Sequence, residues 1–93
     1  MPSLNDIAVR IIKEQELVIG PLAWSEARKV TGLTIVNQTR VEIAVVGNSK
    51  EVIDRLVAQY ERLFGRASHE VCREATLSLV MKMSPSEVPA SLR

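Results

Sequence analysis

Cysteine and aromatic residues are scarce in this 93-residue chain. Cys72 is the only cysteine, so neither an internal disulfide nor a four-cysteine zinc site can form within one chain. A lone thiol is typical of the reducing cytoplasm. Aromatic side chains make up 3% of the residues, too few to expect a platform that stacks the bases of single-stranded nucleic acid.

Net charge and long apolar runs are also lacking. Twelve Lys and Arg residues against eleven Asp and Glu residues give a formal charge of +1, without a basic run, which makes nucleic-acid binding unlikely. No apolar stretch approaches the length of a membrane span, and residues 1–10 do not have the basic and apolar regions of a secretory signal. We therefore expect a cytoplasmic protein that does not bind membranes.

The first half of the sequence predicts two helices followed by a β-hairpin. Ser3 or Asn5 can cap a first helix, whose apolar stripe ends at Gly20. Pro21 suits the first position of a second helix, where its missing N–H costs nothing. Two β-branched segments between residues 33 and 47 flank a polar triplet, and this pattern predicts the hairpin.

The second half predicts a third and a fourth helix. Asn48 and Glu51 form a plausible capping pair for the third helix, which ends at Gly65. The fourth helix is expected from about Ala67 to Met83. The apolar face expected to point inward on this helix comprises Ala67, Val71, Cys72, Ala75, Leu79 and Met83.

These elements predict a single α+β domain in residues 1–83, in the order αα–ββ–αα, with a central hairpin between two helix–glycine–helix units. We expect Gly20 and Gly65 to take the left-handed conformation that ends a helix and turns the chain. Residues 84–93 contain two prolines and small polar residues, so we expect them to bury little and to form a flexible tail.

The two helical units match each other at an offset of 45 residues. One interpretation is a duplicated unit. The other is that two amphipathic helix pairs aligned at a glycine share a pattern through helical periodicity alone. The identical matched pairs are Arg10 and Arg55, Glu16 and Glu61, Gly20 and Gly65, and Arg28 and Arg73.

No pattern in the chain identifies a catalytic, metal or cofactor site. His69 and Cys72 stand three positions apart on the fourth helix, which suggests either a thiolate–imidazole pair or half of a shared metal site. The favoured interpretation makes Cys72 a small core residue and His69 a residue at the edge of the core. The acidic residues are scattered and contain no general acid–base pair.

Surplus apolar residues are the more informative signal, and they point to self-association. Leu77, Val80 and Met81 lie largely outside the expected inward face of the fourth helix, so a second subunit is a candidate to cover them. Trp24 lies at the margin of its helix stripe, where an interface anchor and a core residue are equally plausible.

The sequence therefore favours a non-enzymatic protein-interaction or adaptor module that forms a homo-oligomer, with a dimer as the first expectation and with a further protein partner that the sequence does not identify. One alternative is a nucleic-acid-associated regulator, in which a basic patch forms only after folding. Another is a small oligomeric enzyme or ligand-binding protein with a site shared between chains.

Overall fold

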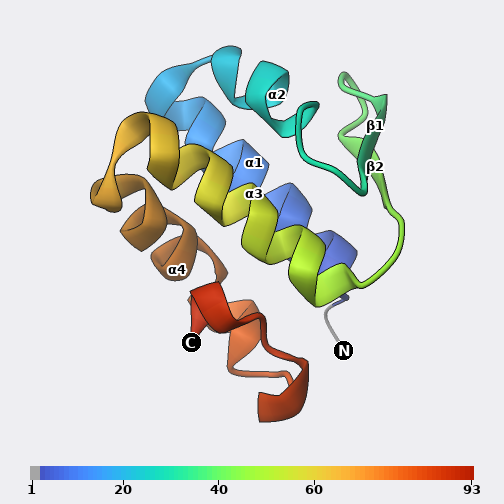
Figure 1. The fold of residues 1–93 in the computed structure, drawn as a ribbon, viewed down its shortest axis with the longest axis vertical. Helices are drawn as coiled ribbons and strands as arrows, with labels where there is room; N and C mark the ends of the chain where they lie inside the picture. Colours follow the sequence, from blue (N-terminus) through green and yellow to red (C-terminus); the bar gives the residue numbers. More distant parts are fainter. Residues whose placement is uncertain (1–2) are drawn as a thin grey trace.

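In the computed structural model, which describes residues 3–93, four α-helices and one β-hairpin follow one another in the predicted order (Figure 1). The fold is a small α+β domain. Helices α2 and α4 each contact both α1 and α3. The elements are α1 (Leu4–Ile19), α2 (Leu22–Ala27), β1 (Leu33–Asn37), β2 (Glu42–Val45), α3 (Ser49–Phe64), α4 (Arg66–Val80) and two short 3-10 helices, η1 (Pro85–Glu87) and η2 (Ala90–Leu92).

Side-chain caps fix the starts of α1 and α3. The Ser3 hydroxyl accepts a hydrogen bond from the Asp6 amide, and the Asp6 carboxylate accepts one from the Ser3 amide. Asn48 Oδ1 accepts a hydrogen bond from the Glu51 amide at 3.2 Å. These bonds satisfy amides that have no partner inside the helix. Of the two candidate caps of the first helix, Ser3 is the one used, and the expected cap at Asn48 is confirmed.

Glycine ends both α1 and α3, as the sequence predicts, but its backbone conformation differs from the predicted left-handed one. Gly20 has φ 71° and ψ −155°, and Gly65 has φ 87° and ψ −179°. The positive φ agrees with the expectation, whereas ψ is extended rather than left-handed helical. This region of backbone conformation is essentially restricted to glycine. Pro21 caps α2 instead of forming its first residue, a shift of one position.

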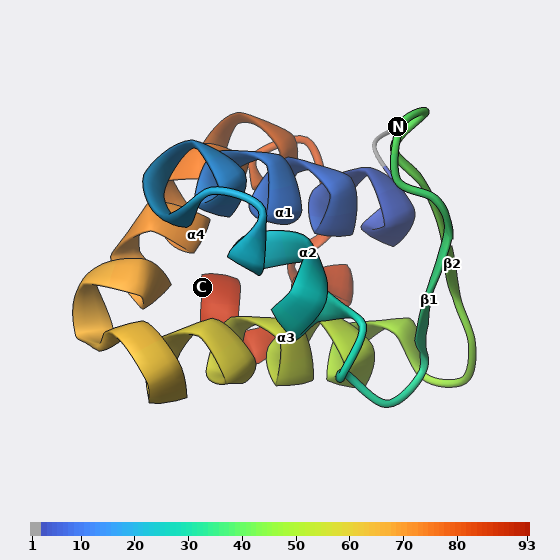
Figure 2. The ribbon, with the colours of Figure 1, turned by 90° about the horizontal axis from the view of Figure 1, so that it is seen from above.

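The hairpin covers the end of the domain at which α1 and α3 begin (Figure 2). Strands β1 and β2 pair antiparallel, with Leu33 opposite Val45 and Ile35 opposite Ile43. Ile43 is buried and Glu42 is exposed, so these neighbouring residues lie on opposite faces of β2. The side-chain amide of Asn5 on α1 donates a hydrogen bond from Nδ2 to the Ile43 carbonyl, and this bond joins the hairpin to the helices.

The two halves of the chain bury equivalent positions at the 45-residue offset. Each buried position of α1 has a buried counterpart on α3. The buried residues are Ile7, Ala8, Ile11, Ile12 and Gln15 on α1, and Val52, Ile53, Leu56, Val57 and Tyr60 on α3.

Contacts between the halves are reciprocal as well. Gln15 Nε2 donates to the Ser68 carbonyl at 3.0 Å, and Tyr60 Oη donates to the Ala23 carbonyl at 2.7 Å. At the 45-residue offset, Gln15 is equivalent to Tyr60 and Ala23 is equivalent to Ser68. Each half therefore makes the same contact to the other, as an approximate two-fold relation between the halves requires. Helical periodicity does not produce such cross-contacts, so they favour the interpretation of the match as a repeated unit.

Helix α4 presents a narrower and more polar face to the core than predicted. Its buried residues are Ser68, Cys72 and Thr76, each one turn apart. Thr76 Oγ1 donates to the Cys72 carbonyl, so its hydroxyl is satisfied within the helix. Ala67 is exposed, which corrects its assignment to the inward face. The helix ends at Val80, before the expected Met83.

Residues 84–93 pack against the helices. Val88 and Leu92 are each 5% exposed, and η2 contacts both α3 and α4. The Ser91 amide and hydroxyl both donate to Asp54 Oδ1 on α3. The expectation that this segment buries little is therefore wrong, because Val88, Pro89 and Leu92 are all buried against the rest of the domain. We call residues 84–93 the C-terminal segment.

Candidate functional site

The outer side of α4 exposes two of the three side chains that the sequence singles out. Leu77 is 57% exposed and Met81 is 76% exposed. Val80 is half-buried and packs against the core, so less of its side chain is free than predicted. Large apolar side chains that remain this exposed lose the free energy that burial would provide. Their role as an interface stays a prediction.

A groove of about 610 Å³ runs between α1 and α4 beside these residues. Val18 on α1 is 64% exposed and lines it together with Leu77. Charges of both signs lie along the same groove, with Arg10, Glu14 and Glu74 in its lining. Arg10 Nη1 also donates to the Ala75 carbonyl at 3.4 Å, a contact that joins the two helices. We call this surface, with Met81, the α1/α4 face.

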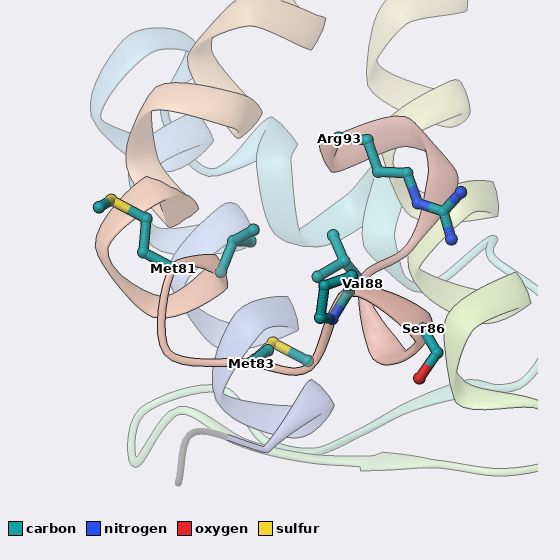
Figure 3. Close-up of a pocket in the computed structure, with 7 residues that line it drawn as sticks. Met81, Met83, Ser86, Val88 and Arg93 are labelled. Carbon is teal, nitrogen blue, oxygen red and sulfur yellow. The ribbon is translucent and has the colours of Figure 1, made fainter.

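A second groove, of about 600 Å³, continues from Met81 toward the C-terminal segment (Figure 3). Val80, Met81 and Met83 come from the end of α4 and the turn that follows it, whereas Val88 and Arg93 come from the C-terminal segment. The lining is apolar, with methionine side chains that adapt easily to a bound surface. The sequence prediction missed this groove because it expected the segment to be flexible.

Trp24 lies in the core and does not contribute to this surface. Its side chain is 2% exposed, and Nε1 donates to Glu16 Oε2 at 2.7 Å. Of the two interpretations of Trp24, core packing is the one that the structure supports, and its assignment as an interface candidate is corrected. The physical reason is that α2 packs against both α1 and α3, and Trp24 is buried in that packing.

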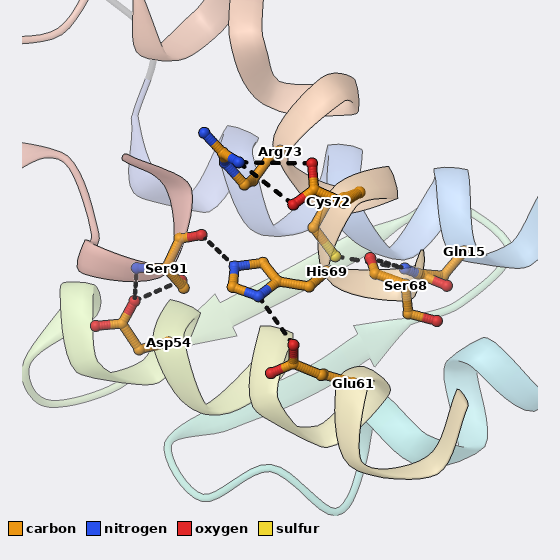
Figure 4. A network of polar contacts seen from close by, with 9 residues as sticks. Gln15, Asp54, Glu61, Ser68, His69, Cys72, Arg73 and Ser91 are labelled. Atoms are coloured by element: carbon orange, nitrogen blue, oxygen red, sulfur yellow. Dashed lines mark hydrogen bonds and ion pairs between the residues drawn. The ribbon is translucent and has the colours of Figure 1, made fainter. Parts of the chain in front are cut away.

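His69 and Cys72 are neighbours on α4, but their side chains bond to different groups (Figure 4). Cys72 Sγ accepts a hydrogen bond from Gln15 Nε2, whereas the His69 ring contacts Glu61 and Ser91. Burial raises the pKa of the Cys72 thiol to about 11, so it is neutral at pH 7 and a poor nucleophile. The hypothesis of a thiolate–imidazole pair finds no support in this geometry.

The contacts of His69 were not predicted from the sequence, although a signal for one of them was present. Glu16 contacts Trp24 eight residues later, and Glu61 contacts His69 at the same spacing in the other half. At the 45-residue offset, a glutamate therefore lies opposite a nitrogen of an aromatic ring in both halves. Within residues 3–93, no three His, Cys, Asp or Glu side chains come together in a way that could hold a metal ion.

Comparison of the chain with protein-family models, with curated proteins and with solved structures gave no significant match. Among the helices of residues 3–93, none has the length and apolar character needed to cross a membrane.

Proposed function

We propose that this protein is a non-enzymatic interaction module that works as a symmetric homodimer, with the α1/α4 face as its interface. The observation that carries the proposal is the exposure of Leu77 and Val18, which line the groove between α1 and α4, together with the exposure of Met81 one helical turn after Leu77. In proportion to their exposed fractions, burial of Leu77 and Met81 contributes about 2–4 kcal/mol per subunit. That contribution corresponds to roughly 30-fold or more in affinity.

A second copy of the chain is the occupant that suits the charges of this face. Arg10 and Glu74 line the same groove with opposite signs, and neither forms an ion pair within residues 3–93. Two-fold symmetry brings one surface against itself in the reverse direction, so Arg10 of each subunit can meet Glu74 of the other. One surface then supplies both halves of each pair. A cytoplasmic location is consistent with the unpaired Cys72.

Sedimentation or light scattering at micromolar concentration tests the association. The wild-type chain should be dimeric, and Leu77→Asp and Met81→Asp should shift it toward monomer. Val36→Asp is the matched control, since Val36 is 60% exposed but lies on the hairpin. If the α4 variants unfold, Val18→Asp probes the same face from α1. A folded wild-type monomer would end the proposal.

A charge-swap experiment tests the identity of the occupant. Arg10→Glu and Glu74→Arg should each weaken self-association, because like charges then meet across the interface. An equimolar mixture of the two variants should associate again, because both intersubunit pairs are restored in the heterodimer. If the mixture associates no better than either variant alone, the second copy does not bind in this orientation.

A further inference from the structure

Both ring nitrogens of His69 face hydrogen-bond acceptors. Nδ1 lies 3.1 Å from Glu61 Oε2 on α3, and Nε2 lies 2.6 Å from the Ser91 carbonyl oxygen in the C-terminal segment (Figure 4). A carbonyl cannot donate, and neither can an ionised carboxylate. A neutral imidazole carries one N–H and can satisfy one of these contacts, whereas the imidazolium carries two and satisfies both.

The C-terminal segment is held at Ser91 by two side chains. The Ser91 amide and hydroxyl donate to Asp54 Oδ1, and the Ser91 carbonyl faces Nε2 of His69, an imidazole that can lose a proton near neutrality. The equivalent position in the first half is Trp24, whose indole N–H is always a donor. Only the second half of the repeat therefore has a contact that protonation controls.

We propose that His69 is a pH-sensitive latch that fastens the C-terminal segment onto α3 and α4, and that loss of its proton loosens the segment. Release would uncover Val88 and Leu92, which are buried when the segment is docked. It would also remove the wall that Val88 and Arg93 give to the groove beside Met81. The latch thus controls the shape of a surface that adjoins the α1/α4 face.

The charged groups around His69 come from all three elements packed there. Glu61 and Asp54 lie on α3, Glu70 and its ion-pair partner Arg73 on α4, and Arg93 two residues after Ser91. The Ser91 carbonyl, and then the Glu61 carboxylate, raise the pKa of His69 above its ordinary value of 6.5, while burial opposes them. Because the pKa is raised when the segment is docked, the stabilisation that protonation adds is fully present below 6.5 and is lost as the pH rises through the higher value.

NMR on the full chain tests the latch without any substitution, because His69 is the only histidine. The pH dependence of its ring signals gives the pKa, and hydrogen exchange of the amides of residues 88–92 gives the opening equilibrium of the segment. Linkage requires these two measurements to agree, since opening should increase tenfold for each unit by which the pKa of His69 with the segment docked exceeds its pKa with the segment open. A pKa at or below 6.5, or an opening equilibrium that does not change with pH, would overturn the proposal.

Two variants separate the latch from general packing. His69→Gln removes the titrating group, so opening of the segment should become independent of pH over the range in which the wild type changes. Glu61→Gln keeps the histidine and its contact with Ser91 but removes a charge that faces His69 in both states of the segment, so the pKa of His69 should fall and the change in opening should persist at lower pH. Retention of the full wild-type pH dependence in His69→Gln would show that another group controls the segment.

Discussion

Gly65→Ala tests whether backbone conformation alone makes glycine necessary at the end of α3. A Cβ at this position would have no heavy atom within 4 Å beyond its chain neighbours, so the substitution creates no packing clash. The φ of 87° with extended ψ remains, and a non-glycine residue in this region costs about 1–3 kcal/mol. For a domain of this size, each kcal/mol should lower Tm by about 4–8 °C.

Urea denaturation of wild type, Gly65→Ala and Gly32→Ala gives the comparison. Gly32 also has a positive φ, but its added Cβ would lie 2.7 Å from Val52 Cγ2 and 2.9 Å from the Val46 carbonyl oxygen. Gly32→Ala should therefore lower the free energy of unfolding more than Gly65→Ala does, because it adds a steric clash to the same backbone strain. D-alanine in place of Gly65, introduced by chemical synthesis, favours positive φ and should restore stability. An unchanged midpoint for Gly65→Ala would refute the backbone argument.

The remaining predictions concern residues in the core. Tyr60→Phe should lower the free energy of unfolding by about 1 kcal/mol, because it removes the hydroxyl that donates to the Ala23 carbonyl. Gln15→Met should change the free energy of unfolding by less than about 1 kcal/mol, because the substitution also removes Oε1, the one buried side-chain polar atom within residues 3–93 that lacks a partner. Parallel urea titrations of the two variants check both values, and equal losses would contradict the reasoning. Cys72→Ala should fold and still self-associate, with a loss of about 1 kcal/mol from reduced packing. In the wild type, the thiol should resist a disulfide reagent at pH 8 until the protein unfolds, because burial raises the pKa of Cys72 to about 11; rapid labelling of the native protein would contradict this.

The sequence by itself determined the local structure of this protein. Apolar stripes at helical spacing, the caps Ser3 and Asn48, and the glycines that end α1 and α3 act through residues close together in the chain, so they can be interpreted without knowledge of the fold. The β-branched segments likewise specified the hairpin. The exposed Leu77 and Met81 followed from the same periodicity.

Only the tertiary structure decided which surfaces meet. Trp24 was placed in the core because α2 packs against two helices, an arrangement that its own neighbours in sequence do not encode. The C-terminal segment is docked through Asp54, 37 residues from Ser91, and the groove on the α1/α4 face joins Arg10 to Ala75 across 65 residues. The two partners of His69 lie in different elements for the same reason. Such contacts depend on how whole helices pack, and packing is settled by the buried surface of the entire chain rather than by the propensity of any one segment.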